Sequence, residues 1–311
     1  MQRIVPFRVF ESRVSLTEEQ KQFLKDNLAG TWTYREDSGE VDVKGDFQGS
    51  GLELGGFMGI QFGRVSGDFY CGGNALTSLA GSPREVGGVF SCTSNHLITL
   101  EGGPQRVGRN YWCFDNDLTS LTGAPQEIPG GFDCSGNALT SLKDGPEQTG
   151  NFYCNSNVLT SLVGAPREVR GFFQANENEL QTLVGAPEVV RGHFECKSNP
   201  LTSLSGAPRE LEGEFVSDSL VLFRGDWNEE GWLRALDRYR GKNPQASSLL
   251  LTLMGPDFWN RKMQESPEQT LIDLGPIWND PVFAQIRAQI RVPDRYRDEM
   301  GLLGDLGELG F

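Results

Sequence analysis

Six cysteines recur through the middle of the chain at an almost constant interval, and this interval restricts the possible folds more than any other feature. They lie at positions 71, 92, 113, 134, 154 and 196, so the intervals are 21, 21, 21, 20 and 42 residues. Seven consecutive units align on this period, among them FYCGGNALTSLAGSPREV and FSCTSNHLITLEGGPQRV. Self-similarity at a fixed period of about 20–29 residues is typical of stacked repeats. The chain is therefore expected to form a repeat solenoid.

Each unit follows the pattern aromatic-x-Cys-x-x-Asn-x-Leu-x-x-Leu-x-x-x-Pro. The aromatic residue and the cysteine are two positions apart, so both should point inward from one short strand. A single unit cannot bury its own apolar side, so the units should stack into a parallel sheet. An asparagine follows the end of each strand, and its amide is expected to satisfy backbone groups of its own turn and the adjacent one. This asparagine column comprises Asn74, Asn95, Asn116, Asn137, Asn157, Asn178 and Asn199.

Glycine is unusually frequent, with 39 residues in 311, and the period predicts where the excess is used. A Gly-Ala-Pro segment, as at 123–125, should turn the chain, because proline fixes φ and excludes a long helix from the return arm. The return arm is therefore expected to be extended or polyproline-like. A second set of glycines opens the strands and is expected to provide the second turn, at Gly67, Gly88, Gly150, Gly171, Gly192 and Gly213.

The unit resembles the leucine-rich repeat in its short form, with Asn-x-Leu-Thr-Ser-Leu and a proline on the convex side. It is most similar to repeat proteins of large tailed bacteriophages, and more distantly to secreted leucine-rich-repeat effectors of Gram-negative pathogens, some of which carry a C-terminal ubiquitin-ligase domain. The resemblance covers roughly residues 16–220. It implies a β-rich solenoid in the form of a horseshoe, with a parallel concave sheet and extended or polyproline-like convex arms. It also implies a phage-encoded protein, but a repeat motif alone says little about function.

Four segments are expected along the chain. Residues 1–40 should hold a capping helix, which a capping box at Thr17 and Gln20 begins and which runs to about Leu28 with Gly30 closing it. Residues 41–66 look like a degenerate capping repeat, and 67–220 hold the seven repeats plus a partial one. Residues 221–311 should form a small α-helical domain with helix starts at Asp226, Ser266 and Asp280. This domain could cap the last turn or dock a partner, as could the tail GLLGDLGELGF.

The candidate chemistry favours a protein that is not an enzyme. The cysteine spacing contains no CxxC pair, so the thiols should be small, reduced and buried, with no metal and no cofactor. The effector ligases require a nucleophilic cysteine in the C-terminal domain, whereas no cysteine follows Cys196. His96 and His193 are the only histidines, and both are expected to be ordinary surface residues. No P-loop, dinucleotide-binding or zincin motif is present.

The outward face of the strands carries the strongest functional signal. Residues that flank the buried aromatic and cysteine should form an aromatic stripe with polar neighbours, and such surfaces are typical of binding sites. An alternative is that the rings lie flat against their neighbours and only shield the sheet. The candidate partner-binding residues are Tyr70, Trp112, Phe114, Asp133, Tyr153, Phe172 and His193.

The net negative charge of the chain indicates which classes of partner it can bind. The net charge is −14, and residues 67–220 hold 18 Asp or Glu against 9 Lys or Arg, a net of −9. Such a surface favours a basic or neutral protein partner and disfavours nucleic acid. The N-terminus has no signal-peptide pattern and no apolar run is long enough for a membrane span, so the host cytoplasm or the virion is expected. The predicted function is protein binding as a virion component or a host-factor binder, and the alternative is a carbohydrate-binding adhesin.

Overall fold

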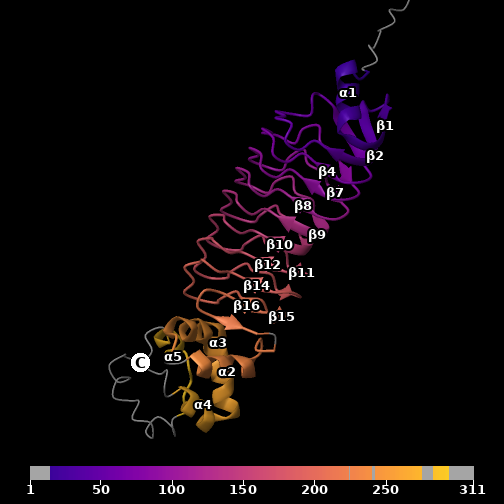
Figure 1. Cartoon of the computed structure of the whole chain (residues 1–311). Helices are drawn as coiled ribbons and strands as arrows, with labels where there is room; N and C mark the ends of the chain where they lie inside the picture. Colours follow the sequence, from indigo (N-terminus) through magenta and orange to yellow (C-terminus); the bar gives the residue numbers. More distant parts are fainter. Residues whose placement is uncertain (1–14, 224, 240–241, 275–282, 294–311) are drawn as a thin grey trace, which may run out of the picture.

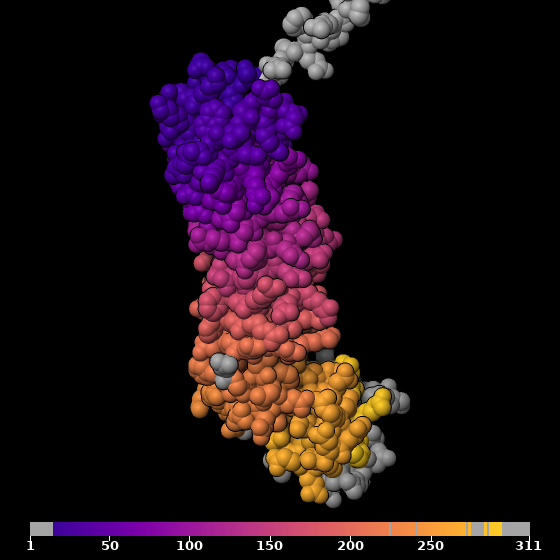
Figure 2. Space-filling view, turned by 90° about the vertical axis from the view of Figure 1, so that its right-hand side faces the viewer, coloured from indigo at the N-terminus to yellow at the C-terminus, as the bar shows by residue number. Residues whose placement is uncertain are grey.

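The chain forms an elongated parallel β-solenoid of about eight turns, with a cap at its N-terminal end and a few helices at its C-terminal end (Figure 1). The computed structural model describes residues 15–223, 225–239, 242–274 and 283–293. Figure 2 shows the turns as one continuous column, coloured in sequence order from the cap to the helices. The expected repeat solenoid is therefore confirmed, and each unit contributes one turn.

The first strand of each turn carries the buried aromatic residue, and we call these the aromatic strands. They pair in parallel with aromatic residues directly opposite each other, as in Phe90 with Tyr111 and Tyr111 with Phe132. The aromatic strands are β2 (Glu40–Gln48), β4 (Phe69–Tyr70), β6 (Phe90–Ser91), β8 (Tyr111–Trp112), β9 (Glu127–Asp133), β10 (Gln148–Tyr153), β12 (Phe173–Gln174), β14 (Phe194–Glu195) and β16 (Phe215–Val216).

Each return arm contains a second short parallel strand, which the sequence did not predict. These valine strands pair at their buried residue, as in Val65 with Val86 and Val86 with Val107. A strand of two residues is too short to show the alternating pattern by which strands are recognised. The valine strands are β3 (Gln61–Val65), β5 (Glu85–Val86), β7 (Arg106–Val107), β11 (Glu168–Val169), β13 (Val189–Val190) and β15 (Glu210–Leu211), and β9 and β10 run through both positions.

The one short interval of 20 residues is absorbed between these two positions. In β9 and β10, Thr149 pairs with Ile128 and Asn151 pairs with Gly131, so one residue fewer lies between the pairs in β10. Phe152 therefore remains opposite Phe132. Both strand positions keep their register through the shortened turn.

The interior is a set of continuous columns of fully buried side chains. The aromatic rings follow one another at centroid distances such as 5.8 Å for Phe69 and Phe90 and 5.0 Å for Phe173 and Phe194. Cysteines, two leucines per turn and the valines complete the core. Stacking thus buries on both sides what one turn would leave exposed.

The asparagine column forms the predicted ladder of hydrogen bonds. Asn116 accepts from the Leu97 backbone N–H at 3.1 Å and donates to the carbonyls of Cys92 and Cys113, each at 3.1 Å. Asn157 repeats this arrangement two turns later. Each amide therefore links its own turn to the preceding one.

The six cysteines are buried and free. Each thiol lies within hydrogen-bond distance of a backbone carbonyl of the next turn, for example Cys71 Sγ at 3.2 Å from the Ser91 oxygen. Burial raises the pKa of these thiols, that of Cys113 well above the usual range. They are small core residues held in their protonated form.

The glycines of the two predicted turns differ in backbone geometry. Gly123, in a Gly-Ala-Pro turn, has a φ of 96°, and a Cβ there would lie 2.4 Å from the Leu100 carbonyl oxygen. Gly88, which opens an aromatic strand, does not adopt a positive φ. Its Cβ would overlap Asp68 Oδ1 of the preceding turn. The chain bends at Gly88 before the aromatic strand, as the predicted second turn requires, and the absence of a side chain there is needed for close packing against the preceding turn.

The N-terminal cap combines helix α1 (Glu18–Asn27) with strand β1 (Leu28–Arg35). Thr17 and Gln20 form both hydrogen bonds of the predicted capping box. Gly30 does not close the helix, because the chain becomes extended at Leu28 and β1 pairs antiparallel with β2. Gly30 instead faces Gly45 across this pair, where a Cβ would overlap the Lys44 carbonyl oxygen.

At the other end, strand β17 (Val221–Leu222) pairs antiparallel with β16, and helices follow. Trp227 stacks on Phe215, the last ring of the column, at 5.4 Å and donates from Nε1 to the Pro208 carbonyl. The described helices are α2 (Glu229–Tyr239), α3 (Pro244–Glu265), α4 (Pro267–Leu274) and α5 (Ala284–Arg287). This end of the chain therefore covers the final turn.

Of the predicted helix starts within the described residues, the one at Ser266 is confirmed and the one at Asp226 is wrong. Asp226 does not begin a helix, since α2 begins at Glu229 and Asn228 accepts from the Gly231 N–H. Ser266 directly precedes α4, as predicted. The predicted start at Asp280 and the tail GLLGDLGELGF lie outside the described residues.

Candidate functional site

The outward-facing residues of the aromatic strands form one row in direct register, which we call the central row. Strand pairing places Trp112 opposite Ser91 on one side and Asp133 on the other, and Tyr153 follows Asp133. The central row is Gln48, Tyr70, Ser91, Trp112, Asp133, Tyr153, Gln174, Glu195 and Val216. The sequence period therefore correctly placed four of the candidate residues in a single line.

A second row, one residue before each buried aromatic, holds neighbouring turns together. Asp68 Oδ1 accepts from the Val89 N–H at 2.7 Å, and Asn110 Oδ1 accepts from the Gly131 N–H at 2.7 Å. Asn151 and His193 make the same contact two and four turns beyond Asn110. Each of these side chains thus accepts a hydrogen bond from a backbone N–H of the next turn. The sequence predicted only that they point outward.

The aromatic residues of the candidate site are partly buried. Tyr70, Trp112, Phe114 and Tyr153 have intermediate exposure, and Phe172 is 41% exposed. The Tyr70 hydroxyl reaches Asp68 at 3.1 Å. The rings therefore cover part of the sheet and also leave part of their own surface exposed. This result lies between the two predicted alternatives, an exposed binding stripe and rings that only shield the sheet.

Phe172 and His193 form a separate pair. Their rings stack at 5.2 Å with an interplanar angle of 21°, and His193 Nδ1 accepts from the Glu214 N–H at 3.1 Å. Both residues lie in the second row, beside the central row. His193 thus combines a ring contact and a backbone contact in its immediate surroundings.

Asp133 lies between two aromatic residues in the central row. Ser135 donates its backbone N–H to Asp133 Oδ1 at 3.0 Å. Burial raises the pKa of the Asp133 carboxyl. Burial and the neighbouring Asp133 charge also raise the pKa of the Tyr153 hydroxyl. The carboxylate is thus partly desolvated next to aromatic surface.

The two aromatic residues that flank Asp133, Trp112 and Tyr153, each carry one polar group. In the part of the chain that the structure describes, neither the Trp112 indole N–H nor the Tyr153 hydroxyl makes a hydrogen bond to protein. Both side chains have intermediate exposure and neither of these atoms is buried, so both groups are accessible to a ligand. Tryptophan and tyrosine with a free polar group are frequent anchors of interfaces.

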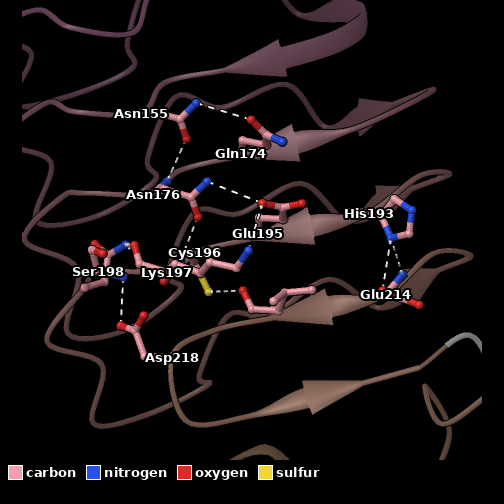
Figure 3. A network of polar contacts seen from close by, with 12 residues as sticks. Asn155, Gln174, Asn176, His193, Glu195, Cys196, Lys197, Ser198, Glu214 and Asp218 are labelled. Carbon is pink, nitrogen blue, oxygen red and sulfur yellow. Dashed lines mark hydrogen bonds and ion pairs between the residues drawn. The ribbon is translucent and has the colours of Figure 1, made fainter.

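A network of polar side chains continues the face toward the C-terminal end (Figure 3). Asn155 Oδ1 accepts from the Asn176 N–H at 2.9 Å, and Asn176 Oδ1 accepts from the Lys197 N–H at 2.7 Å. The Lys197 ammonium lies 3.7 Å from Glu195, and Asn155 contacts Gln174. These amides were read as outward-facing from the sequence, but their mutual contacts depend on spacing across turns and were missed.

The charges are unevenly distributed over the array. Several arginines lie on the return arms and pair there with glutamates, such as Arg167 with Glu188 and Arg191 with Glu168. Within residues 67–220, Lys197 is the one lysine or arginine on the aromatic strands and the two residues after each of them, and it is paired with Glu195. Strand β2 of the cap carries Lys44. The candidate face is therefore predominantly acidic.

The side chains of the described residues that could bind a metal ion or act as a nucleophile are dispersed or buried. No group of three or more His, Cys, Asp or Glu side chains in the described ranges is arranged to hold a metal ion. His96 is exposed and contacts Asp117 at 3.1 Å. The cysteine thiols are buried with raised pKa values, so they are poor nucleophiles.

No protein-family model, curated protein or solved structure matches the chain. The resemblance to phage leucine-rich-repeat proteins thus depends on the sequence pattern of residues 16–220 alone.

Proposed function

We propose that the chain is a non-enzymatic binding scaffold that holds a protein partner on its aromatic-strand face. One observation carries the proposal: Trp112, Phe114 and Tyr153 keep part of their surface exposed on a sheet in regular register, and the polar groups of Trp112 and Tyr153 make no hydrogen bond within the described residues. Preorganised aromatic anchors lose little conformational entropy on binding. The acidic surroundings favour a basic or neutral partner.

The test is capture of partners from host lysate by wild type and by Trp112→Ala with Phe114→Ala. A matched control removes apolar surface away from this face, at Ile98 and Val184, which are 57% and 46% exposed. The proposal expects capture to fall at least several-fold for the first pair and to stay at the wild-type level for Ile98→Ala with Val184→Ala. Unchanged capture by the Trp112 and Phe114 variant would exclude this face.

We propose further that the repeats are of the leucine-rich-repeat type and that the protein is phage-encoded, serving as a virion component or as a binder of a host factor in the cytoplasm. The asparagine ladder and the two buried leucines per turn support the repeat type. In the described residues no helix is long and apolar enough to cross a membrane. Proteomics of purified particles separates the two roles, since absence from the particle would rule out the virion role.

Carbohydrate binding is the second candidate. It is favoured by the position of Tyr153 next to the amides of Asn155 and Gln174, because sugars bind by stacking on rings and by hydrogen bonds to amides. A glycan array with wild type and Trp112→Ala tests it. Absence of wild-type binding to any glycan would remove this candidate.

A further inference from the structure

Three consecutive residues of the central row form a distinctive group, which we call the carboxylate cage: Trp112, Asp133 and Tyr153. Direct pairing places Asp133 next to Trp112 in one strand and Tyr153 in the other. Neighbouring strands lie about 4.8 Å apart, so the Cα atoms of the two aromatic residues are about 10 Å apart. The Asp133 carboxylate is therefore flanked by an aromatic side chain on each neighbouring strand.

The ring of Tyr153 leans over the strand that carries Asp133. Its Cε2 atom lies 3.7 Å from where a Cβ of Gly131 would be, and Gly131 is on the same side of β9 as Asp133. Because Gly131 has no side chain, the ring can approach the sheet here. The aromatic surface is thereby placed beside the carboxylate.

The carboxylate is not neutralised within the protein. Among the described residues, Asp133 forms no ion pair, and its hydrogen-bond partner is Ser135. Glu195, in the same row, differs because Lys197 lies 3.7 Å away and the neighbours in register are Gln174 and Val216. Asp133 thus combines a free negative charge, partial burial and flanking rings.

We propose that the carboxylate cage binds an arginine side chain of a basic protein partner, with the guanidinium between Trp112 and Tyr153 and paired with Asp133. This assignment rests on the proposed protein-binding function and names the chemistry that the face recognises. A guanidinium is planar, stacks on aromatic rings and donates to a carboxylate in the same plane. The net charge of −9 on residues 67–220 favours the approach of a basic segment.

The raised pKa of Asp133 agrees with this role. Burial destabilises the unpaired carboxylate in the free protein, and a cation placed next to it would relieve this cost. The Tyr153 hydroxyl, which makes no hydrogen bond to another described residue, is available to a second polar group of the partner segment. The cage is therefore complementary to a cation and incomplete without one.

The experiment is calorimetric titration of the whole protein with the blocked peptide acetyl-Gly-Ser-Arg-Ser-Gly-amide. The comparison peptide replaces arginine by citrulline, which keeps the shape and removes the charge. We expect the arginine peptide to bind about tenfold more tightly, the loss typical of a charge-assisted contact. Equal affinity for the two peptides would overturn the assignment.

Matched variants locate the contact. Asp133→Asn keeps the oxygen that accepts from Ser135, and it should weaken the arginine peptide about tenfold. Glu195→Gln removes the same charge from the same row, and it should change affinity less than about twofold because that site lacks flanking rings. Equal losses in the two variants would refute the cage and leave only general charge attraction.

Failure of this assignment can be told from failure of the proposed function. If both peptides bind alike while Trp112→Ala with Phe114→Ala still abolishes capture of a protein partner, the face binds proteins by other contacts and only the arginine assignment falls. If capture is also unchanged, both fall.

Discussion

Replacing Asn116 by alanine should destabilise the solenoid by an amount that the hydrogen-bond ladder predicts. The Leu97 N–H loses its acceptor and is buried, which costs about 1–3 kcal/mol. The carbonyls of Cys92 and Cys113 each keep one further amide, from Asn95 and Asn137. Their loss is therefore partial, about 1 kcal/mol together. The expected total is about 2–4 kcal/mol.

Urea unfolding at pH 7, followed by circular dichroism and tryptophan fluorescence, measures this loss from the shift of the midpoint at an unchanged slope. The control is Asn110→Ala, which removes one hydrogen bond, to Gly131, from a half-exposed side chain. The Gly131 N–H is buried too, so the loss of its acceptor should cost about 1–3 kcal/mol, but no carbonyl contact is lost with it. If Asn116→Ala costs no more than Asn110→Ala, the ladder does not support the turns as described.

Three further predictions concern charge, glycine geometry and the thiols. Asp133→Asn should raise the melting temperature at pH 7, because the raised pKa means that folding disfavours the carboxylate. The gain should shrink as the pH falls through the raised pKa and wild-type Asp133 takes up its proton; no gain at pH 7 would contradict this. Gly123→Ala should destabilise more than Gly225→Ala, since both have nearly the same φ, 96° and 95°, but only the first meets backbone atoms; equal losses would mean that φ alone matters. The six cysteines should react with a thiol reagent only after unfolding, and rapid labelling of the native protein would show that the thiol column is accessible.

The parts of the fold that depend on one repeated column could be predicted from the sequence. The aromatic residues, the cysteines and the asparagines recur at one period, so their inward direction and the ladder of Asn116 followed from stacking alone. The valine strands were missed because a two-residue strand such as Glu85–Val86 has no periodic pattern. Gly30 was predicted to end the first helix, but it lies in a strand that pairs with β2. Asp226 was predicted to begin a helix, but Asn228 is the residue that accepts a hydrogen bond from the first turn of α2.

The sequence predicted the order of the residues along the candidate site, but not the surface that their side chains form. The period alone places Trp112, Asp133 and Tyr153 in consecutive turns. It does not show how the Tyr153 ring leans over Gly131, nor that Asn110 is used to bind the next turn. Those features depend on side-chain directions and distances between turns, which a single repeat unit does not contain.

The most direct test of the central claim is hydroxyl-radical footprinting of the protein with and without its captured partner. Binding on the aromatic-strand face predicts that oxidation of Trp112, Phe114 and Tyr153 falls several-fold in the complex. Oxidation of Ile98 and Phe223, exposed side chains outside the central row, should not change. Unchanged oxidation of Trp112 and Tyr153 in a saturated complex would contradict the account and move the binding surface elsewhere on the molecule.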